Sequence, residues 1–214
     1  MPGCCTTTGY RQMFSERRAL ADARRYRRRG LDRTSRRLVQ LVSGRDVEGR
    51  TVLEVGGGIG AIEIELLRAG AARAVNVELT PTYEEAAAGL LQAIGLAERV
   101  ERRLLDFAEA GGEVAPADIV VLNRVICCYP DMPRLAGAAA GHARRTLALS
   151  FPNDRWWTRL ALGLGNVALR AMRREFRVYA HPPRQVVATV EGHGLRVTGG
   201  RRGVFWQVVA FERA

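Results

Sequence analysis

The sequence predicts an α/β protein built on a doubly wound, mostly parallel sheet of about seven strands that ends in an antiparallel hairpin. From Gly49 onward, short apolar runs alternate with helical patterns, as in right-handed βαβ units. The first run passes directly into a glycine-rich turn, and the last two are separated by a short Arg-Arg-Gly segment. A short turn between two apolar runs is typical of a hairpin.

The parallel part of the sheet is expected to contain five strands, at 50–57, 74–79, 100–106, within 117–129 and at 146–152. Helical spacing of apolar residues predicts helices at 61–70, 81–95 and 132–145 between them. Pro81 in a first turn and Gly95 after a last turn mark the bounds of the second helix. A last helix at 182–194 and hairpin strands at 195–200 and 204–213 complete the order.

Two segments lie outside this alternation. Residues 1–48 read as an N-terminal helical cap with a break near Gly30, and an insert at about 153–181 follows the fifth strand. The main domain is expected to span 49–214. At 214 residues, the chain suits one compact unit of this kind.

Charge is unevenly distributed along the chain. All 33 basic residues are arginine, and the net charge is +11. Residues 1–50 hold 13 arginines and 5 acidic residues, 51–130 hold 6 and 12, and 131–214 hold 14 and 5. An acidic centre between basic flanks predicts that the flanking parts meet an anionic substrate or surface.

Composition excludes several classes of protein. A hydrophobic content of 47% is too high for a disordered chain. The longest uncharged apolar run outside the expected strands, 160–169, is half of the roughly 20 residues that span a membrane. The first residues lack the apolar core of a signal peptide, so we expect a cytoplasmic protein.

The glycine-rich turn carries the functional signal. It reads Glu54-x-Gly56-Gly57-Gly58-x-Gly60, and glycines there let a ligand lie against bare backbone. Glu78 ends the next strand, 22 residues after Gly56, where nucleotide-binding α/β folds place a carboxylate for the ribose hydroxyls. The glycine spacing differs from the dinucleotide fingerprint and suits a nucleoside without a pyrophosphate.

In these motifs the sequence resembles the class I S-adenosylmethionine-dependent methyltransferases over about residues 45–214, which implies a Rossmann-like fold, that cofactor and no metal. The resemblance implies that the loop lies beside the methionine and ribose, a role that carries over to Glu54, Gly56, Gly58 and Gly60. The acid that ends the second strand, Glu78, is expected to bind the ribose hydroxyls, with Leu79 next to it in the cofactor site. The acid and the apolar residue after the third strand, Asp106 and Phe107, are expected to hold the adenine, and the end of the fourth strand, Asn123 and Arg124, to face the sulfonium.

Methyl transfer mainly requires alignment of donor and acceptor. A carboxylate acceptor needs no general base, whereas a phenol or amine can use one. Tyr129 and His181 are the candidate catalytic residues, because both are expected near the cleft. His142 and His193 fall at predicted helix ends and are expected to be structural.

The insert at 153–181 suggests how the acceptor is recognised. Its segment 155–174 combines Trp156 and Trp157, an apolar middle and five flanking arginines. It fits a lid over an apolar acidic ligand, a helix at a membrane surface, or a helix packed on the sheet. With the N-terminal cap, this layout is similar to the magnesium-protoporphyrin O-methyltransferase branch, which esterifies a propionate. We therefore expect a small or medium-sized acidic, partly apolar acceptor, with carboxylate O-methylation as one outcome.

Two alternatives remain beside that interpretation. The pairs Cys4–Cys5 and Cys127–Cys128 would suit a thiol or metalloid methyltransferase, since thiolates bind soft metals, although adjacent residues in a strand point to opposite faces. The basic flanks would suit an RNA-binding methyltransferase. The segment after the fourth strand reads Asn-Arg-Val-Ile-Cys-Cys-Tyr-Pro and lacks an Asn/Asp-Pro-Pro-Tyr/Phe pocket, which argues against nucleic acid.

Overall fold

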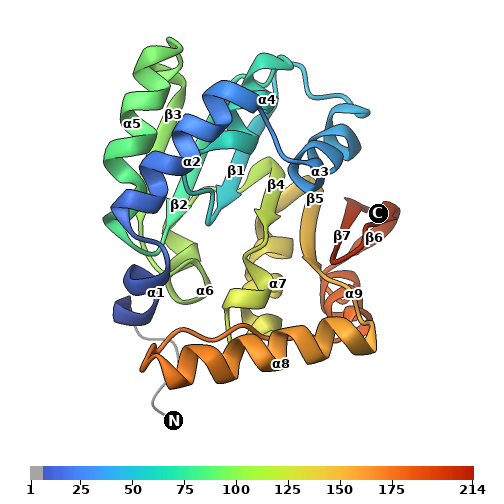
Figure 1. Ribbon diagram of the computed structural model, residues 1–214. Helices are drawn as coiled ribbons and strands as arrows, with labels where there is room; N and C mark the ends of the chain where they lie inside the picture. Colours follow the sequence, from blue (N-terminus) through green and yellow to red (C-terminus); the bar gives the residue numbers. More distant parts are fainter. Residues whose placement is uncertain (1–6) are drawn as a thin grey trace.

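The computed structural model, which describes residues 7–214, contains a seven-stranded sheet in the order β3-β2-β1-β4-β5-β7-β6 (Figure 1). The first five strands pair in parallel, and β7 is antiparallel to both β5 and β6. The expected doubly wound sheet with a C-terminal hairpin is therefore confirmed. The strands are β1 Thr51–Val55, β2 Arg73–Glu78, β3 Val100–Leu104, β4 Ala117–Asn123, β5 Ala143–Pro152, β6 Leu195–Arg202 and β7 Trp206–Arg213.

Helices fill the connections as expected. They are α4 Ala61–Arg68, α5 Glu84–Ala93, α6 Phe107–Ala110, α7 Met132–His142, α8 Trp156–Ala171 and α9 Pro183–Glu191. Short 3-10 turns precede α5 and β3 and follow α6 and β4. The expected helix at 132–145 ends three residues early, because β5 begins at Ala143 and continues into the sheet. Strand β6 likewise extends through Arg202, so the hairpin turn lies at 203–205.

The N-terminal segment forms three helices, α1 Thr7–Met13, α2 Glu16–Arg29 and α3 Arg33–Ser43. Gly30 ends α2 with a φ of 64°, a conformation that glycine adopts without strain. The Asp32 side chain then begins α3 by accepting hydrogen bonds from the backbone N–H groups of Thr34 (2.9 Å) and Ser35 (3.2 Å). We use the term helical cap for α1, α2 and α3 below.

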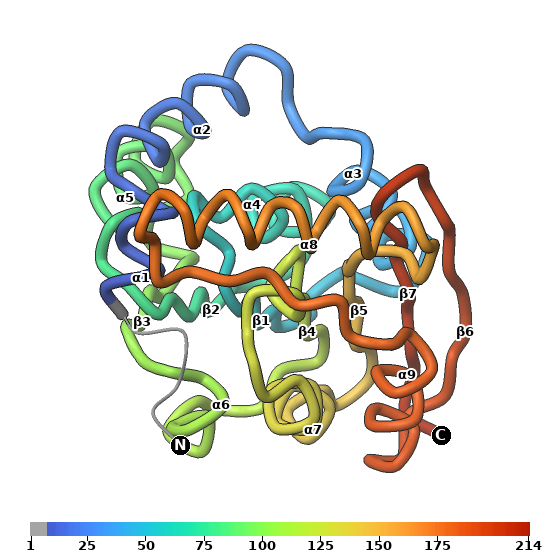
Figure 2. Tube along the Cα trace, turned by 60° about the horizontal axis from the view of Figure 1, so that its bottom comes forward, coloured from blue at the N-terminus to red at the C-terminus, as the bar shows by residue number. Residues whose placement is uncertain are grey.

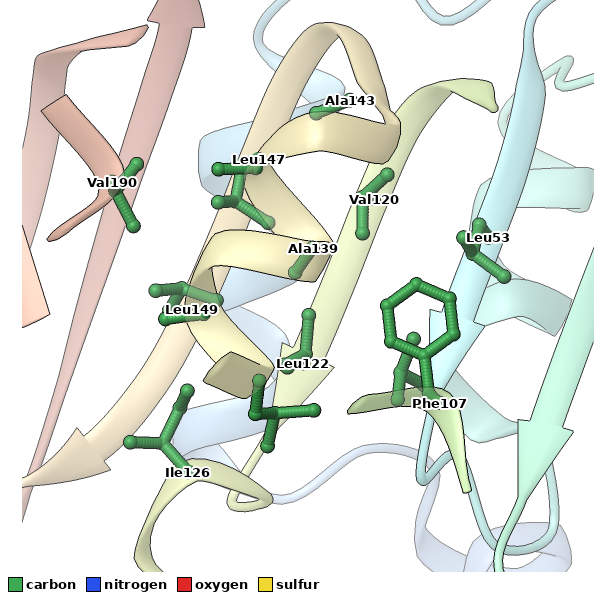
Figure 3. Packing of buried hydrophobic residues seen from close by; sticks show 14 of the residues in the cluster. Leu53, Phe107, Val120, Leu122, Ile126, Ala139, Ala143, Leu147, Leu149 and Val190 are labelled. Atoms are coloured by element: carbon green, nitrogen blue, oxygen red, sulfur yellow. The ribbon is translucent and has the colours of Figure 1, made fainter. Parts of the chain in front are cut away.

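Alternating residues of the central strands face two buried layers. On β4, Val120 and Leu122 pack with α7 and α9, whereas Ile119 and Val121 pack with α3 and α4. Figure 3 shows the first layer, in which Leu122 and Leu149 lie beside Ala139 of α7. A third cluster joins α2 to α5 through Tyr26, Ile64, Tyr83 and Leu90. The sheet is therefore covered on both faces, and the loops at the carboxyl ends of its parallel strands lie at one edge.

Helix α8 crosses the molecule at that carboxyl-terminal edge. Figure 2 shows it in front of the strands, running from the β5–β7 side toward α1. Only Thr158 is buried among its residues. No helix within residues 7–214 is both long enough and apolar enough to span a bilayer.

Candidate functional site

A cavity of about 290 Å³ opens between the helical cap and the loops that follow β1, β2, β3 and β4. Those loops supply the glycine-rich turn, the Glu78 carboxylate and the residues from Leu105 to Phe107, together with Asn123 and its neighbours. The cap contributes Tyr10, Phe14 and Arg18. The cavity therefore lies outside the carboxyl ends of parallel strands, where open α/β sheets bind ligands.

The glycine-rich turn places bare backbone against this cavity. Gly56, Gly58 and Gly60 all have positive φ values, of 65°, 60° and 77°, which other L-residues adopt only with strain. The N–H of Gly56 donates to the carbonyl of Val77 (2.7 Å) and ties the turn to β2. A Cβ atom on Gly58 would lie 3.2 Å from the Tyr83 ring. Both conformation and space thus require glycine at this position.

Two predicted acidic residues hold the turn and face the cavity. Glu54 is buried and accepts a hydrogen bond from the backbone N–H of Glu63 (2.8 Å) at the start of α4. Burial, and then the nearby charge of Glu63, raise the pKa of Glu54 well above its usual range. Glu78 accepts a hydrogen bond from the N–H of Gly58. Burial raises its pKa as well, against the opposing effect of that hydrogen bond.

A buried polar network behind the turn was not anticipated from the sequence. Arg102 on β3 binds Glu84 through two hydrogen bonds (3.0 and 2.7 Å) and donates to the carbonyl of Gly58 (3.0 Å). Glu63 is fully buried and accepts from Asn76 (2.9 Å). Arg102 thus brings positive charge beneath an acidic turn. The sequence signal that could have found it is the presence of Arg102 and Arg103 inside the expected strand 100–106.

Asp106 and Phe107 lie together on the next wall. The Asp106 carboxylate begins α6 by accepting from the N–H of Ala108 (3.0 Å), and it also accepts from the hydroxyl of Tyr129 (3.1 Å to each oxygen). Phe107 is buried, with its ring 5.0 Å from the His142 ring. Leu79 also lines the cavity. Burial and the Asp106 charge raise the pKa of Tyr129, so its hydroxyl keeps its proton at neutral pH.

The end of β4 connects the cavity to the helical cap. Arg124 has a φ of 64°, and its N–H donates to the Ser150 hydroxyl (2.9 Å). Its guanidinium forms an ion pair with Asp32 of the cap (2.6 Å) and lies 5.3 Å from the centre of the Trp206 ring. Asn123 donates to the Ser35 hydroxyl (3.0 Å). Asp32 and Ser35 are therefore site-supporting residues that the motifs did not indicate.

The candidate base His181 occupies a different position from Tyr129. Its Nε2 lies 2.9 Å from the carbonyl of Tyr129, and its ring stacks on Tyr179. Burial lowers its pKa. Among the described residues, His181 is not part of the cavity lining, whereas Tyr129 is. His142 lies within hydrogen-bonding distance of the carbonyls of Ala138 and Gly111, and His193, just after α9, of the carbonyl of Thr189. Such contacts fit the structural roles expected of both residues.

The cysteines differ from the geometry expected of a strand. Cys127 and Cys128 lie in a 3-10 turn, Ile126–Cys128, so their sulfur atoms lie on the same side, 3.8 Å apart. Both are within hydrogen-bonding range of the Arg124 carbonyl (3.6 and 3.4 Å). Cys4 and Cys5 fall outside the described residues. Within 7–214, no group of three or more histidine, cysteine or acidic side chains is arranged to hold a metal ion.

The insert supports the cavity wall without lining it. In the part of the chain that the structure describes, none of residues 153–181 faces the cavity. Phe176, which follows α8, is buried against Tyr10 and Phe14 of the cap, with ring centres 5.5 Å apart in both contacts. The helical cap therefore closes the cavity, and the insert holds the cap in place from outside.

Comparison with known proteins gives this arrangement a family context. A protein family described as "Methyltransferase domain" matches residues 23–198. A ribosomal protein L11 methyltransferase from Pectobacterium carotovorum is 30% identical over 112 residues, which are 50% of this chain and 38% of that protein. The corresponding enzyme from Klebsiella pneumoniae is 33% identical over 94 residues, 44% of this chain and 31% of that one. The chain thus matches well under half the length of these relatives.

Solved structures share the fold over almost the whole chain. Magnesium protoporphyrin IX methyltransferase from Synechocystis PCC 6803, with bound S-adenosylhomocysteine, has a TM-score of 0.68 and 16% identity, covering 96% of this chain and 93% of that one. An O-methyltransferase family protein from Burkholderia thailandensis has a TM-score of 0.68 and 24% identity, covering 94% and 63%. At these identities the similarity establishes a common architecture.

Proposed function

Because the chain belongs to the methyltransferase domain family, whose cofactor is S-adenosylmethionine, we propose that it methylates a small or medium-sized acidic, partly apolar acceptor, and that the atom methylated is a carboxylate oxygen. The observation that carries this proposal is that both candidate bases are already engaged in hydrogen bonds within the protein. The Tyr129 hydroxyl already donates a hydrogen bond to Asp106, and His181 is hydrogen-bonded to a backbone carbonyl and is not part of the cavity lining. Because neither of these two candidate bases is free to take a proton from an acceptor in the cavity, the arrangement favours an acceptor that is already ionised.

The residues of the cavity fit this cofactor. The backbone of Gly56 and Gly58 lines the cavity beside the Glu78 carboxylate. That carboxylate can accept further hydrogen bonds, as from the two hydroxyls of a ribose. Asp106 and Phe107 form the adjoining wall, with a hydrogen-bond acceptor and an apolar surface for the adenine. The side chains of Glu54, Glu78 and Asp106 also give the cavity an excess of hydrogen-bond acceptors, which suits the hydroxyl and amino groups of this cofactor.

Catalysis by these residues consists of binding, orientation and exclusion of water. When bound, S-adenosylmethionine supplies a methyl group activated by its sulfonium, and transfer leaves a neutral thioether that keeps the carbon–sulfur electron pair. The acceptor's carboxylate oxygen forms the new carbon–oxygen bond and releases no proton. The helical cap covers the cavity from outside, so Tyr10 and Phe14 shield the reacting atoms from water.

We assign recognition of the acceptor's acidic group to Arg18. Two other arginines that line the cavity are already paired, Arg25 with Asp22 and Arg124 with Asp32. Within residues 7–214, no carboxylate forms an ion pair with Arg18, whose guanidinium lies 5.6 Å from the centre of the Phe14 ring. A cation against an aromatic ring at the cavity mouth fits an acceptor that is both anionic and partly apolar.

The test is transfer of a labelled methyl group from S-adenosylmethionine to a panel of carboxylate, phenol and thiol acceptors. We expect product with an apolar carboxylic acid, in the form of a base-labile ester. Arg18→Gln should raise KM for that acid about tenfold with little change in kcat. Arg17→Gln, also exposed on α2, is the matched control and should leave KM unchanged.

Other results would redirect the assignment. Exclusive labelling of phenols or thiols would contradict carboxylate methylation, and equal KM values for the two arginine variants would contradict the role of Arg18. Salt-sensitive retention of the protein on RNA, together with labelling of the RNA, would favour the nucleic-acid alternative.

A second candidate function rests on the cysteine geometry. The sulfur atoms of Cys127 and Cys128 are close enough to bind one soft metalloid together, and Cys128 lines the cavity. A thiol or metalloid methyltransferase would then bind trivalent arsenic beside the cofactor. Arsenite-dependent quenching of tryptophan fluorescence that is lost in Cys128→Ser, with Ser43→Ala as an unrelated control, would favour this function over the first.

A further inference from the structure

Four large apolar residues of α8 face solvent, on the side where a surface helix usually carries polar residues. Trp156, Leu160, Leu164 and Val167 are 76%, 54%, 61% and 65% exposed. At 3.6 residues per turn, these four positions fall on a single face. We call this face the α8 stripe. In Figure 1, α8 is the outermost element at its edge of the molecule, and no described residue covers the stripe.

The inner side of α8 is held by other contacts. Asn166 exchanges two hydrogen bonds with the backbone of Val178 (2.7 and 2.9 Å). Thr158 is fully buried, and the Trp157 ring lies 6.2 Å from the Phe205 ring. The helix is therefore fixed to the protein by these contacts while the stripe is presented outward. Exposed apolar faces of this kind mark interaction sites.

The hairpin turn extends the same surface. Asn153 donates hydrogen bonds to the carbonyls of Gly203 and Val204 (2.8 Å each) and so anchors the turn next to the start of α8. Val204 is 75% exposed. Arg201 and Arg202, just before it, are also exposed.

Charge identifies the occupant of this surface. Residues 155–174 contain five arginines and no acidic residue, and all five are exposed: Arg155, Arg159, Arg170, Arg173 and Arg174. An apolar stripe with cations at both ends matches a bilayer that carries anionic headgroups. A second copy of the chain would bring these arginines against one another in either helix direction. A nucleic acid would pair with the arginines but leave the stripe exposed.

We propose that the α8 stripe and the hairpin turn dock the protein on the surface of an anionic lipid bilayer, with α8 lying in the interface. The carboxyl-terminal edge of the sheet, where the cavity lies, then faces the membrane (Figure 2). A partly apolar acceptor held in the lipid would be presented at that edge. The docking itself does not depend on which acceptor is methylated.

The experiment is flotation of the full chain with vesicles of phosphatidylcholine alone or mixed equally with phosphatidylglycerol. The wild type should float with the mixed vesicles, remain unbound with phosphatidylcholine, and lose binding at about 0.5 M salt, where charges are screened beyond a few ångströms. A stripe variant, Leu160→Gln with Leu164→Gln, should bind the mixed vesicles at least about tenfold more weakly, since the apolar contribution is lost.

A matched pair of charge variants distinguishes binding through this surface from nonspecific attraction by the positive charge of the whole protein. Arg170→Gln, Arg173→Gln and Arg174→Gln together should reduce binding, whereas Arg27→Gln, Arg28→Gln and Arg29→Gln, which remove the same charge from exposed positions of α2, should not. Equal losses in the two triple variants, or unchanged binding of the stripe variant, would overturn the proposal. So would a dimeric wild type that the stripe variant converts to monomers without any vesicle binding.

Binding of S-adenosylhomocysteine by calorimetry keeps this test independent of the enzymatic function. The stripe variant should bind S-adenosylhomocysteine as the wild type does, which shows that it is folded. Vesicle binding by a protein that lacks methyl transfer would leave the docking surface established and the proposed reaction refuted. The reverse result would refute the docking alone.

Discussion

The Glu78 carboxylate accepts a hydrogen bond from the N–H of Gly58 in the glycine-rich turn and also lines the cavity. We predict that Glu78→Gln weakens binding of S-adenosylhomocysteine about 10- to 100-fold, because hydrogen bonds to a charged group contribute about 1.5–3 kcal/mol. Isothermal titration calorimetry measures this directly. Glu85→Gln, at an exposed position of α5, is the control, and an equal effect in both variants would remove Glu78 from the cofactor site.

Gly58 offers a second test at the residue scale. Gly58→Ala should lower the free energy of unfolding by about 1–2 kcal/mol, the cost of a left-handed conformation for an L-residue, and should weaken S-adenosylhomocysteine binding as its Cβ approaches the Tyr83 ring. Gly89→Ala is the contrasting control, because nothing lies within 4 Å of its Cβ position in α5. That change should stabilise the protein by about 0.5–1 kcal/mol. Urea denaturation of both variants would reveal a wrong assignment if they changed stability in the same direction.

Individual residues were predictable from the sequence where a motif fixes the backbone. Gly56, Gly58 and Glu78 line the cavity, as their spacing indicates. Gly60, also expected at the cofactor, does not line it and instead begins α4 as its N-cap residue. Their assigned roles toward the cofactor remain predictions. His181 could not be placed in advance, since its position depends on the carbonyl of Tyr129, a residue 52 positions earlier. The adjacent cysteines were misjudged because a 3-10 turn, and not a strand, contains them.

At the scale of elements, Asp32 connects α3 to the end of β4. Asp32→Asn keeps a good N-cap residue but loses the ion pair with Arg124, which should cost about 1 kcal/mol. Asp32→Ala loses both the ion pair and the N-cap hydrogen bonds, and should lower the free energy of unfolding by about 1 kcal/mol more. Urea denaturation at pH 6 gives both values. Identical stabilities for the two variants would show that the N-cap contributes nothing.

Because of this ion pair, the difference in the free energy of unfolding between the wild type and Asp32→Asn should depend on pH in a defined way. Burial alone would raise the pKa of Asp32, but the charge and hydrogen bond of Arg124, with the bonds from Ser35, lower it overall. A lowered folded-state pKa stabilises the fold above the unfolded-state pKa of about 3.9 and loses that effect as the pH falls through the folded-state value. The stability difference should therefore be fully present at pH 6 and decrease as the pH falls below about 3.9. A difference that grows on acidification would contradict this sign.

Element types followed from periodicity, whereas their contacts did not. The alternation after Gly49 predicted β1 to β5 and the hairpin, and Pro81 and Gly95 bracketed α5 with its preceding turn. The packing of Phe176 against Tyr10 and Phe14 joins residues more than 160 positions apart, and no local pattern encodes such a contact. For that reason a lid over the ligand was one of the three interpretations of the insert, whereas the helical cap, and no described residue of the insert, lines the cavity.

For the whole molecule, stability should depend on the two layers that sandwich the sheet. Leu149→Ala removes a fully buried side chain from β5 and should cost about 2–5 kcal/mol, which lowers Tm by roughly 2–4 °C per kcal/mol in a chain of this size. Leu160→Ala, on the α8 stripe, should change stability by less than about 0.5 kcal/mol. Thermal unfolding followed by circular dichroism compares them, and a large loss in Leu160→Ala would mean that α8 is packed on its outer face.

The packing of α3 has a consequence for how the protein folds while it is being synthesised. Leu38 and Val42 of α3 are buried in the same cluster as Val52, Ala148 and Val208, so their binding surface includes a strand that begins only at Trp206. A ribosome adds about 5–20 residues per second, and α3 therefore leaves the exit tunnel many seconds before the residues of β7 that complete its binding surface. Complete packing of α3 must be among the last folding events, whereas α2 can pack on α5 once that helix has been synthesised.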